Sequence, residues 1–277
     1  MASCVDSILR QTVTDWTYMI VDNGSTDATQ AIAERLVATN PRIDYIRYDQ
    51  HVPVNASYSR AFAEANGKYT KLVGVDDLLY PRCLELMVGL AEEHQLGIVG
   101  SKRRHGDVVD LDGLPETIAN GREVLRQSLL GRLHIMGSPS SLLFRTDLIE
   151  RRQPFFDPTF ARHADTEAAY WTLTHSDFGH VKTVLTYTNY AGESVYSDRL
   201  LSYYPEHLRM IARYGPRVFN FRRYREHFRN ECVGYGLLLI QAQKTPEFVD
   251  FHRQALDLLA GESRRAARAA KLLRCLI

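Results

Sequence analysis

Two apolar segments that each end in acidic residues place the strongest constraint on the fold of this chain. The first runs from Trp16 to Asp22 and the second from Lys71 to Asp77, and turn-forming residues follow both. Short apolar runs of this kind are typical of buried strands in a parallel sheet. Because parallel strands end at one edge of a sheet, we expect the carboxylates to emerge at the edge where open α/β sheets bind ligands.

Composition limits the classes of protein that this chain can belong to. Its 277 residues are 45% hydrophobic, which predicts one large domain, or a domain with an appendage. A formal net charge of +1 argues against a nucleic-acid partner and against an acidic disordered chain. The four cysteines lack the CxxC spacing of a zinc site, which favours reduced thiols.

No apolar run approaches the roughly 18 to 20 residues that a membrane span requires. The N-terminus also lacks the charged and then apolar pattern of a signal peptide. We therefore expect a soluble, cytoplasmic protein.

Predicted strands and helices alternate through about residue 100, which indicates an α/β domain. Asn55 is expected to cap the second of the three helices, and Asn66 with Gly67 to end it. The strands are expected over residues 16–22, 43–48, 69–75 and 97–101, and the helices over residues 28–39, 55–66 and the segment after Pro81.

The pattern is less regular beyond residue 100. We expect a polar hairpin over 107–113, a helix over 121–130, a strand over 140–144 and a helix over 166–174. From Tyr203 onward the chain is rich in arginine and in helical spacing. These features predict an α/β domain over residues 1–200 and a helical C-terminal extension over 201–277.

Five short motifs, in order along the chain, resemble those of the family 2 inverting glycosyltransferases of the GT-A fold. The similarity covers about residues 5–195. It implies a GT-A-like, Rossmann-type, mostly parallel sheet flanked by helices, with the nucleotide-sugar part over about 1–100 and the acceptor part over about 101–200. The motifs are Ser7–Thr12, Val21–Asp27, Ala65–Tyr69, Asp76–Asp77 and Ala164–Asp165.

The resemblance implies an enzyme of polysaccharide biosynthesis at the cell envelope. Its donor would be a nucleoside-diphosphate sugar, and its acceptor would be a hydroxyl of a glycan or of a lipid-linked molecule. Asp22 would bind the nucleotide base or ribose, with Asn23 and Asp76 in the same donor site. From the residues alone, Asp22 also fits a helix-capping turn, in which Asn23, Gly24 and Ser25 shape the backbone.

Asp76 and Asp77 resemble the family's metal motif, in which Mn²⁺ or Mg²⁺ bridges carboxylate and diphosphate oxygens. Asp77 is the expected direct ligand. Val75 stands at a position where an acid is usual, so the metal would bind weakly without the donor diphosphate. Two adjacent acids after a strand also fit an exposed turn.

Inversion requires a base that takes the proton of the acceptor hydroxyl. The resemblance assigns this role to Asp165, with Glu167 as the alternative base. The residues around Asp165 also fit the N-cap of the following helix. His163 is interpreted as an ordinary loop residue.

Two departures from the family pattern affect the donor site. The family's first strand, which ends near Pro-x-Tyr-Asn, is missing, and the chain starts in the first helix. An unpaired central strand would expose backbone groups and apolar surface, which favours a truncated sequence or a compensating partner. Thr188 and Tyr190 stand near positions where relatives carry a basic residue and a histidine, which argues against help to the diphosphate from that loop.

The C-terminal segment Glu262–Ile277 places basic residues at helical spacing beside Ala, Leu and Ile. Such a helix packs its apolar stripe on the domain, or lies at the inner face of the membrane as a peripheral contact. A homo-oligomer is a further expectation. The basic residues are Arg264, Arg265, Arg268, Lys271 and Arg274.

A competing hypothesis is a catalytically inactive GT-A-like binding or scaffold protein in a glycan-assembly complex. A phosphoacceptor signalling domain would also carry a carboxylate cluster at a sheet edge, but it explains neither the later motifs nor the helical extension.

Overall fold

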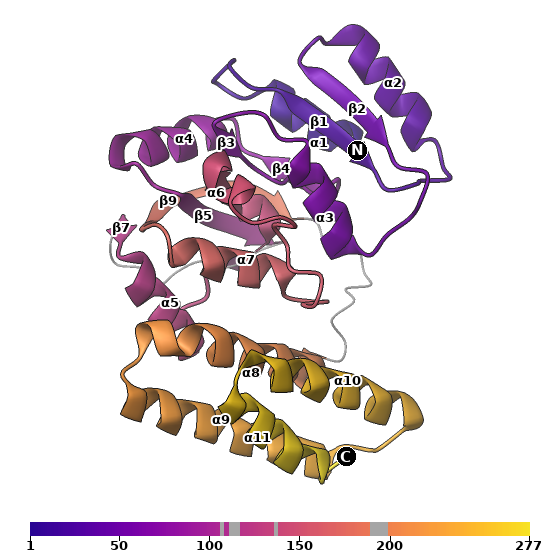
Figure 1. The fold of residues 1–277 in the computed structure, drawn as a ribbon. Helices are drawn as coiled ribbons and strands as arrows, with labels where there is room; N and C mark the ends of the chain where they lie inside the picture. The colour runs from indigo at the N-terminus through magenta and orange to yellow at the C-terminus, as the bar shows by residue number, and fades with distance from the viewer. Residues whose placement is uncertain (106–107, 111–116, 136–137, 189–198) are drawn as a thin grey trace. The chain divides into compact units, whose positions relative to one another are not determined.

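A computed structural model describes residues 1–105, 108–110, 117–135, 138–188 and 199–277. The chain forms two compact units (Figure 1). The first comprises Met1–Gly121, His134–Pro158 and Ala164–Gly192, and the second comprises Arg122–Leu133, Thr159–His163 and Glu193–Ile277. The prediction divided the chain at residue 200 into two continuous parts, whereas segments of the two observed units alternate along the sequence.

The first acidic motif ends a strand in a small parallel sheet. β1 (Tyr18–Asp22) pairs in parallel with β2 (Ile43–Arg47), and α2 (Thr29–Thr39) connects the two strands. Ile20, Ala33 and Ile43 pack with Val5 of α1 (Ala2–Leu9) in one apolar cluster. Because Ile20 and Asp22 are two residues apart on the strand, they share a face, and this packing fixes the direction of Asp22. In the described part of the chain, β2 is the one strand paired with β1.

The second sheet has the strand order β3-β8-β5-β9-β4, with β6 beside β5 and β7 beside β9. β5 and β9 are parallel, and this pairing and β1–β2 are the two longest. The shorter described pairings are antiparallel. The strands are β3 (Tyr69–Thr70), β4 (Asp77–Leu79), β5 (Ile98–His105), β6 (Val108–Asp110), β7 (Ile118–Ala119), β8 (Leu142–Arg145) and β9 (Phe178–Thr188).

Two helices cover the core of this second sheet. α4 (Cys83–His94) follows Pro81, as predicted, and buries Cys83, Met87 and Ala91 at helical spacing. These side chains join Ile8 of α1 in one apolar cluster with Leu79, Val99, Leu143 and Leu185 of the strands. The predicted α/β class is confirmed by this arrangement of helices and sheets.

An aromatic cluster packs the remaining helices of the first unit. Phe62 of α3 (Val54–Ala63) stacks on Phe155 with ring centroids 5.3 Å apart, and Phe155 meets Trp171 of α7 (Ala164–Leu173) edge to face. A 3₁₀ helix, Pro139–Ser141, and the short α6 (Thr146–Glu150) flank β8. The cluster anchors α7, which carries the predicted base.

The second unit is helical, as predicted for the C-terminal extension. It consists of α5 (Gly121–Leu129), α8 (Arg199–Val218), α9 (Phe221–Gln241), α10 (Pro246–Glu262) and α11 (Arg264–Arg274). Arg209 and Arg213 of α8 both form ion pairs with Glu262 of α10. Among the described residues, no helix combines the length and apolar content that a membrane crossing requires.

Three expectations about local structure are wrong. Pro53 precedes the first turn of α3, and Asn55 lies inside that helix, where its amide donates to the Pro158 carbonyl at 3.3 Å. The helix ends at Ala63, before Asn66 and Gly67. The expected strand over 69–75 shrinks to β3 because residues 71–76 have no strand pairing in the described structure. The expected hairpin over 107–113 lies partly outside the described residues.

Candidate active site

Asp22, at the end of β1, is buried and receives three hydrogen bonds from its own chain. The Ser25 amide donates to Oδ1 at 2.7 Å. The Tyr45 hydroxyl and the Arg47 guanidinium each donate to Oδ2 at 2.9 Å. Asp22 and Arg47 are directly opposite in the parallel register, which explains their contact. Asp22 therefore closes the turn that the alternative interpretation described, and its contact with a nucleoside stays a prediction.

Asn23 and Gly24 hold the loop that follows β2. The Asn23 amide donates to the Val52 carbonyl at 2.7 Å and its side-chain oxygen accepts from the Val52 amide at 3.1 Å. Gly24 has a φ of +83°, and a β-carbon there would lie 3.2 Å from the Tyr48 carbonyl. Glycine is thus required both for the backbone conformation and for the close approach of the two segments. The predicted turn-shaping role of these residues is confirmed.

The surroundings of Asp22 lower its pKa. Burial alone would raise the pKa, but the hydrogen bonds from Ser25 and Tyr45 and the charge of Arg47 outweigh that effect. The pKa of Asp22 in the folded state lies below its unfolded value of about 3.9. Above that pH the ionised Asp22 therefore makes its full contribution to the free energy of unfolding. This contribution is lost as the pH falls through the lowered folded pKa.

Asp22→Asn should lower the free energy of unfolding at pH 7 by about 2 kcal/mol, because hydrogen bonds to a buried carboxylate are lost. It should also reduce the loss of stability below pH 4. Urea titrations at several pH values measure both effects. The matched control is Asp49→Asn, since the exposed Asp49 carboxylate lies 3.7 Å from the same Arg47. Equal stability of the two variants would contradict this role of Asp22.

The second acidic motif places its two carboxylates in different environments. Asp76 is exposed, whereas Asp77 is buried at the start of β4. The Ser140 hydroxyl donates to Asp77 Oδ2, and the Ser138 hydroxyl lies 3.4 Å from the same oxygen. The Ser140 hydroxyl also accepts from the Gly74 amide at 2.9 Å. The 3₁₀ helix therefore fixes the direction of the Asp77 carboxylate.

Two basic side chains, Lys71 and Arg103, lie near Asp77. The Lys71 ammonium donates to the carbonyls of Ser140 and Leu142, and burial lowers its pKa. Burial raises the pKa of Asp77, against the opposing effects of the serine hydroxyls and of the Arg103 charge. The serine hydroxyls and the Arg103 charge thus offset part of the cost of burying the Asp77 carboxylate.

The predicted base and its alternative differ in their surroundings. Asp165 lies in the first turn of α7, half-buried, and its Oδ1 accepts from the Thr166 amide at 2.7 Å. Glu167 is fully buried and forms an ion pair with Arg152. A buried, ion-paired carboxylate is poorly placed to accept a proton from a substrate, which argues against Glu167, and the role of Asp165 stays a prediction.

His163, interpreted as a loop residue, belongs to the second unit. Its Nδ1 lies 2.9 Å from the buried Glu206 carboxylate, which also accepts from the backbone amides of Ala161 and His163 at 2.8 and 3.0 Å. Glu206 thus fixes the conformation of this loop. Sequence offered no signal for the pair, because 43 residues separate its members.

The described acids suit a metal that is held partly by a ligand. No three of the described His, Cys, Asp and Glu side chains lie close enough together to hold a metal ion. Mg²⁺ and Mn²⁺ are commonly bound by one or two carboxylates together with substrate phosphates. The exposed Asp76 and the oriented Asp77 fit a site in which substrate phosphates supply the remaining ligands.

Most of the groups that hold the acids in place could not be predicted from the sequence. Arg47 was detectable, since the end of the next parallel strand lies beside the end of β1. Ser138 and Ser140 were not, because more than 60 residues separate them from Asp77. Thr188, noted as a departure from the family, pairs with Asp77 in the ladder between β9 and β4. Tyr190 lies outside the described residues.

Comparison with solved structures supports the fold. The S. aureus TarS 1–349 structure in complex with UDP superposes with a TM-score of 0.71 at 15% identity, covering 99% of this chain and 83% of that chain. TarS in complex with UDP-GlcNAc gives a TM-score of 0.70 at the same identity and coverage. The predicted GT-A-like fold is confirmed by this similarity.

Sequence comparison identifies the family. The putative glycosyltransferase EpsE of Bacillus subtilis (strain 168) is 33% identical over 96 residues, which are 34% of this chain and 34% of EpsE. The hyaluronan synthase of Pasteurella multocida is 34% identical over 119 residues, 43% of this chain and 12% of that protein. The chain thus spans about a third or less of the length of the curated relatives that it matches first.

The family model described as glycosyl transferase family 2 matches residues 1–152. This segment includes β1, β2 and both acidic motifs. Because the match covers more than half of the 277 residues, the chain belongs to glycosyl transferase family 2.

Proposed function

We propose that the protein transfers a sugar from a nucleoside-diphosphate sugar to a hydroxyl of a glycan or lipid-linked acceptor, with inversion at the anomeric carbon. The observation that carries this proposal is the family match over residues 1–152, which contains Asp22, Asp76 and Asp77. Asp76 is exposed, and neighbouring side chains hold the carboxylates of Asp22 and Asp77 in place.

The similarity to known proteins supports the choice of donor and acceptor class. TarS has been crystallised with UDP and with UDP-GlcNAc, which makes uridine nucleotides the first donors to test. Relatives include chondroitin and hyaluronan synthases, which supports a glycan acceptor. In this proposal the turn at Asp22 and Asn23 lies on the nucleoside side of the donor.

The donor diphosphate is proposed to bind at the second acidic motif. Asp76 provides an exposed carboxylate, and Asp77 is the predicted metal ligand, held in place by Ser140. Mn²⁺ or Mg²⁺, when bound there, would neutralise the charge that develops on the departing nucleoside diphosphate. Lys71 fixes the backbone near Asp77 through the Ser140 carbonyl, and Arg103 contributes positive charge to the same region.

Asp165 is the proposed general base. It accepts the proton of the acceptor hydroxyl while that oxygen forms a bond to the anomeric carbon. The bond between this carbon and the diphosphate oxygen breaks on the opposite face, and the electron pair leaves with the nucleoside diphosphate. The protein thereby returns to its starting state once Asp165 releases its proton to water.

Thermal shift measurements test the donor site. A ligand present at about 100 times its Kd raises the free energy of unfolding by roughly 2.7 kcal/mol, which corresponds to a shift of about 5–10 °C for a chain of this size. We expect such a shift for one nucleotide sugar among UDP-, GDP-, dTDP- and CDP-sugars, and we expect Mn²⁺ to increase it. Asp76→Asn should abolish the increase due to Mn²⁺. No shift with any donor would instead indicate a non-catalytic scaffold.

A further inference from the structure

The second unit exposes a row of apolar side chains on one face of α9. Val233, Leu237 and Ile240 are 57%, 54% and 60% exposed, respectively. Residues that are three or four positions apart lie on the same face of a helix, so the three side chains form a continuous strip. Contiguous exposed apolar surface marks an interaction site, whereas single exposed residues need no explanation. We call this strip the apolar row.

α11 lies alongside α9 and extends this surface (Figure 1). At the start of the two helices, the Arg265 guanidinium lies 5.1 Å from the centroid of the Phe221 ring. Near their ends, a β-carbon at Gly236 would lie 3.3 Å from Leu276. The two helices therefore run in the same direction. Leu272 of α11 is 72% exposed and adds a further apolar side chain.

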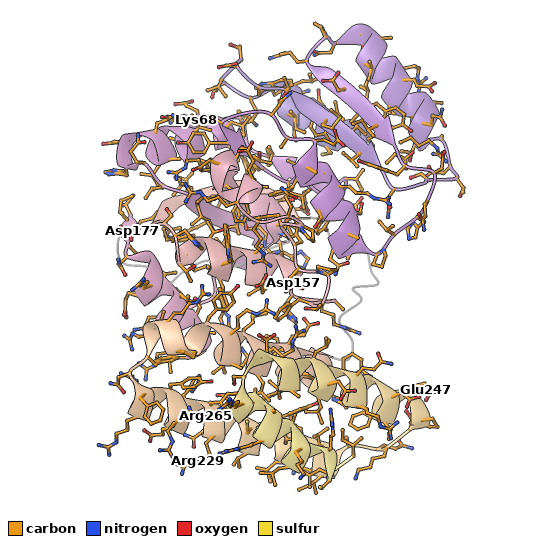
Figure 2. The ribbon with its side chains drawn as sticks, viewed as in Figure 1. Lys68, Asp157, Asp177, Arg229, Glu247 and Arg265 are labelled. Atoms are coloured by element: carbon orange, nitrogen blue, oxygen red, sulfur yellow. The ribbon has the colours of Figure 1, made fainter. Side chains whose placement is uncertain are left out.

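Exposed basic residues accompany the apolar row. Three arginines continue its line toward the start of α9, and three basic residues occupy the exposed face of α11. Figure 2 labels one arginine from each helix, Arg229 and Arg265. The structure records no ion pair at any of these exposed side chains in the part of the chain that it describes. They are Arg222, Arg225, Arg229, Arg264, Arg268 and Lys271.

The positive charge is concentrated in this part of the chain. Residues 199–277 contain 15 Lys and Arg against 7 Asp and Glu, although the whole chain has a formal charge of only +1. α11 contains no acidic residue, and the acids of α9 are Glu226 and Glu231. An anion that approaches these two helices is therefore attracted at long range.

We propose that the α9 and α11 face binds the surface of a bilayer that contains anionic phospholipids. Interfacial helices combine an apolar strip that enters the boundary of the acyl chains with basic residues that contact the headgroups. In this arrangement the apolar row inserts, while the exposed arginines and Lys271 meet the phosphates. The attraction of each basic residue to an anionic surface adds to the binding.

The charges argue against a second copy of the chain as the occupant. A symmetric contact through this face would bring two sets of exposed arginines together, and like charges at an interface are strongly unfavourable. A bilayer also requires no complementary shape. Its apolar layer lies directly beneath negative headgroups, which matches an apolar row flanked by basic side chains.

Vesicle cosedimentation of the full chain tests this proposal. We expect binding to vesicles of phosphatidylcholine with phosphatidylglycerol, little binding to phosphatidylcholine alone, and weaker binding at high salt. The triple variant Val233→Gln, Leu237→Gln and Ile240→Gln should bind at least tenfold more weakly. The pair Arg268→Gln and Lys271→Gln should weaken binding about 30-fold.

Matched controls separate this effect from general changes of the surface. Val54, which is 55% exposed on α3, can be replaced by Gln, and so can the exposed Arg35 on α2; neither change should alter vesicle binding. Circular dichroism melting checks that each variant is folded. If the triple variant is unfolded, the double variant Arg268→Gln and Lys271→Gln provides the test.

Three outcomes would overturn the proposal. The first is no binding to anionic vesicles, which would leave an acidic protein as the partner of this face. The second is unchanged binding of both the triple variant and the charge pair. The third is a dimer of the wild-type chain in analytical ultracentrifugation that the triple variant converts to a monomer.

Discussion

Asp165→Asn should lower kcat by about 10²–10⁴-fold, the range expected when a general base is removed. Asparagine cannot accept the proton of the acceptor hydroxyl, yet its side-chain oxygen can still accept from the Thr166 amide, as Asp165 does at 2.7 Å. The melting temperature and the Kd for the donor nucleotide should therefore stay close to wild type. Steady-state kinetics and nucleotide titrations measure the three quantities.

The competing interpretation of Asp165 is a structural acid at the start of α7. It predicts the opposite pattern, with retained kcat and a lower melting temperature. Asp165→Ser provides the control, because serine also satisfies a helix N-terminus but cannot act as a base at neutral pH. Wild-type turnover by both variants would exclude Asp165 as the base and would require another acceptor for the proton.

Asp76→Asn and Asp77→Asn should each weaken metal-dependent donor binding by about 100-fold or more, because the two adjacent carboxylates are predicted to share one cation. Their effects on stability should differ. Burial raises the pKa of Asp77, so its ionised form costs stability at neutral pH. This cost decreases as the pH falls toward the raised pKa. Asp77→Asn should therefore keep or increase the melting temperature at pH 7.

The supporting serine offers a control for this pair. Ser140→Ala removes the hydroxyl that donates to Asp77 and accepts from the Gly74 amide. It should leave both carboxylates present but less well oriented, so that metal affinity falls by less than in either Asn variant. Undiminished Mn²⁺ dependence in Asp77→Asn would show that Asp77 is not a ligand, and it would leave the role to Asp76.

Elements with strong local signals could be predicted from the sequence. β1, α2, β2 and α4 appear within one or two residues of their expected positions, because apolar spacing and flanking turn residues agree there. The strand expected over residues 69–75 failed for a physical reason. A strand requires a partner, and residues 71–76 form no strand pairing in the described structure. Helix α3 begins at Val54 after Pro53, whose fixed φ starts a helix without the expected Asn55 cap.

The candidate site was predictable only in part, for a related reason. Sequence patterns placed Asp22, Asp76 and Asp77 at the ends of strands and Asp165 at the start of a helix. The structure confirms this for Asp22 and Asp165, whereas Asp76 lies in a turn and Asp77 begins β4, in a different sheet from β1. The sequence patterns gave no information on which carboxylates are buried, because burial depends on distant partners such as Ser140 and Arg152. The roles of the four acids in binding and catalysis stay predictions.

The most direct test is the anomalous-scattering map of a crystal of the chain grown with UDP and Mn²⁺. The account predicts one Mn²⁺ peak within about 2–2.5 Å of a carboxylate oxygen of Asp76 or Asp77, with the UDP diphosphate on its other side. UDP bound elsewhere, or Mn²⁺ distant from both carboxylates while UDP is present, would contradict a donor site at the second acidic motif.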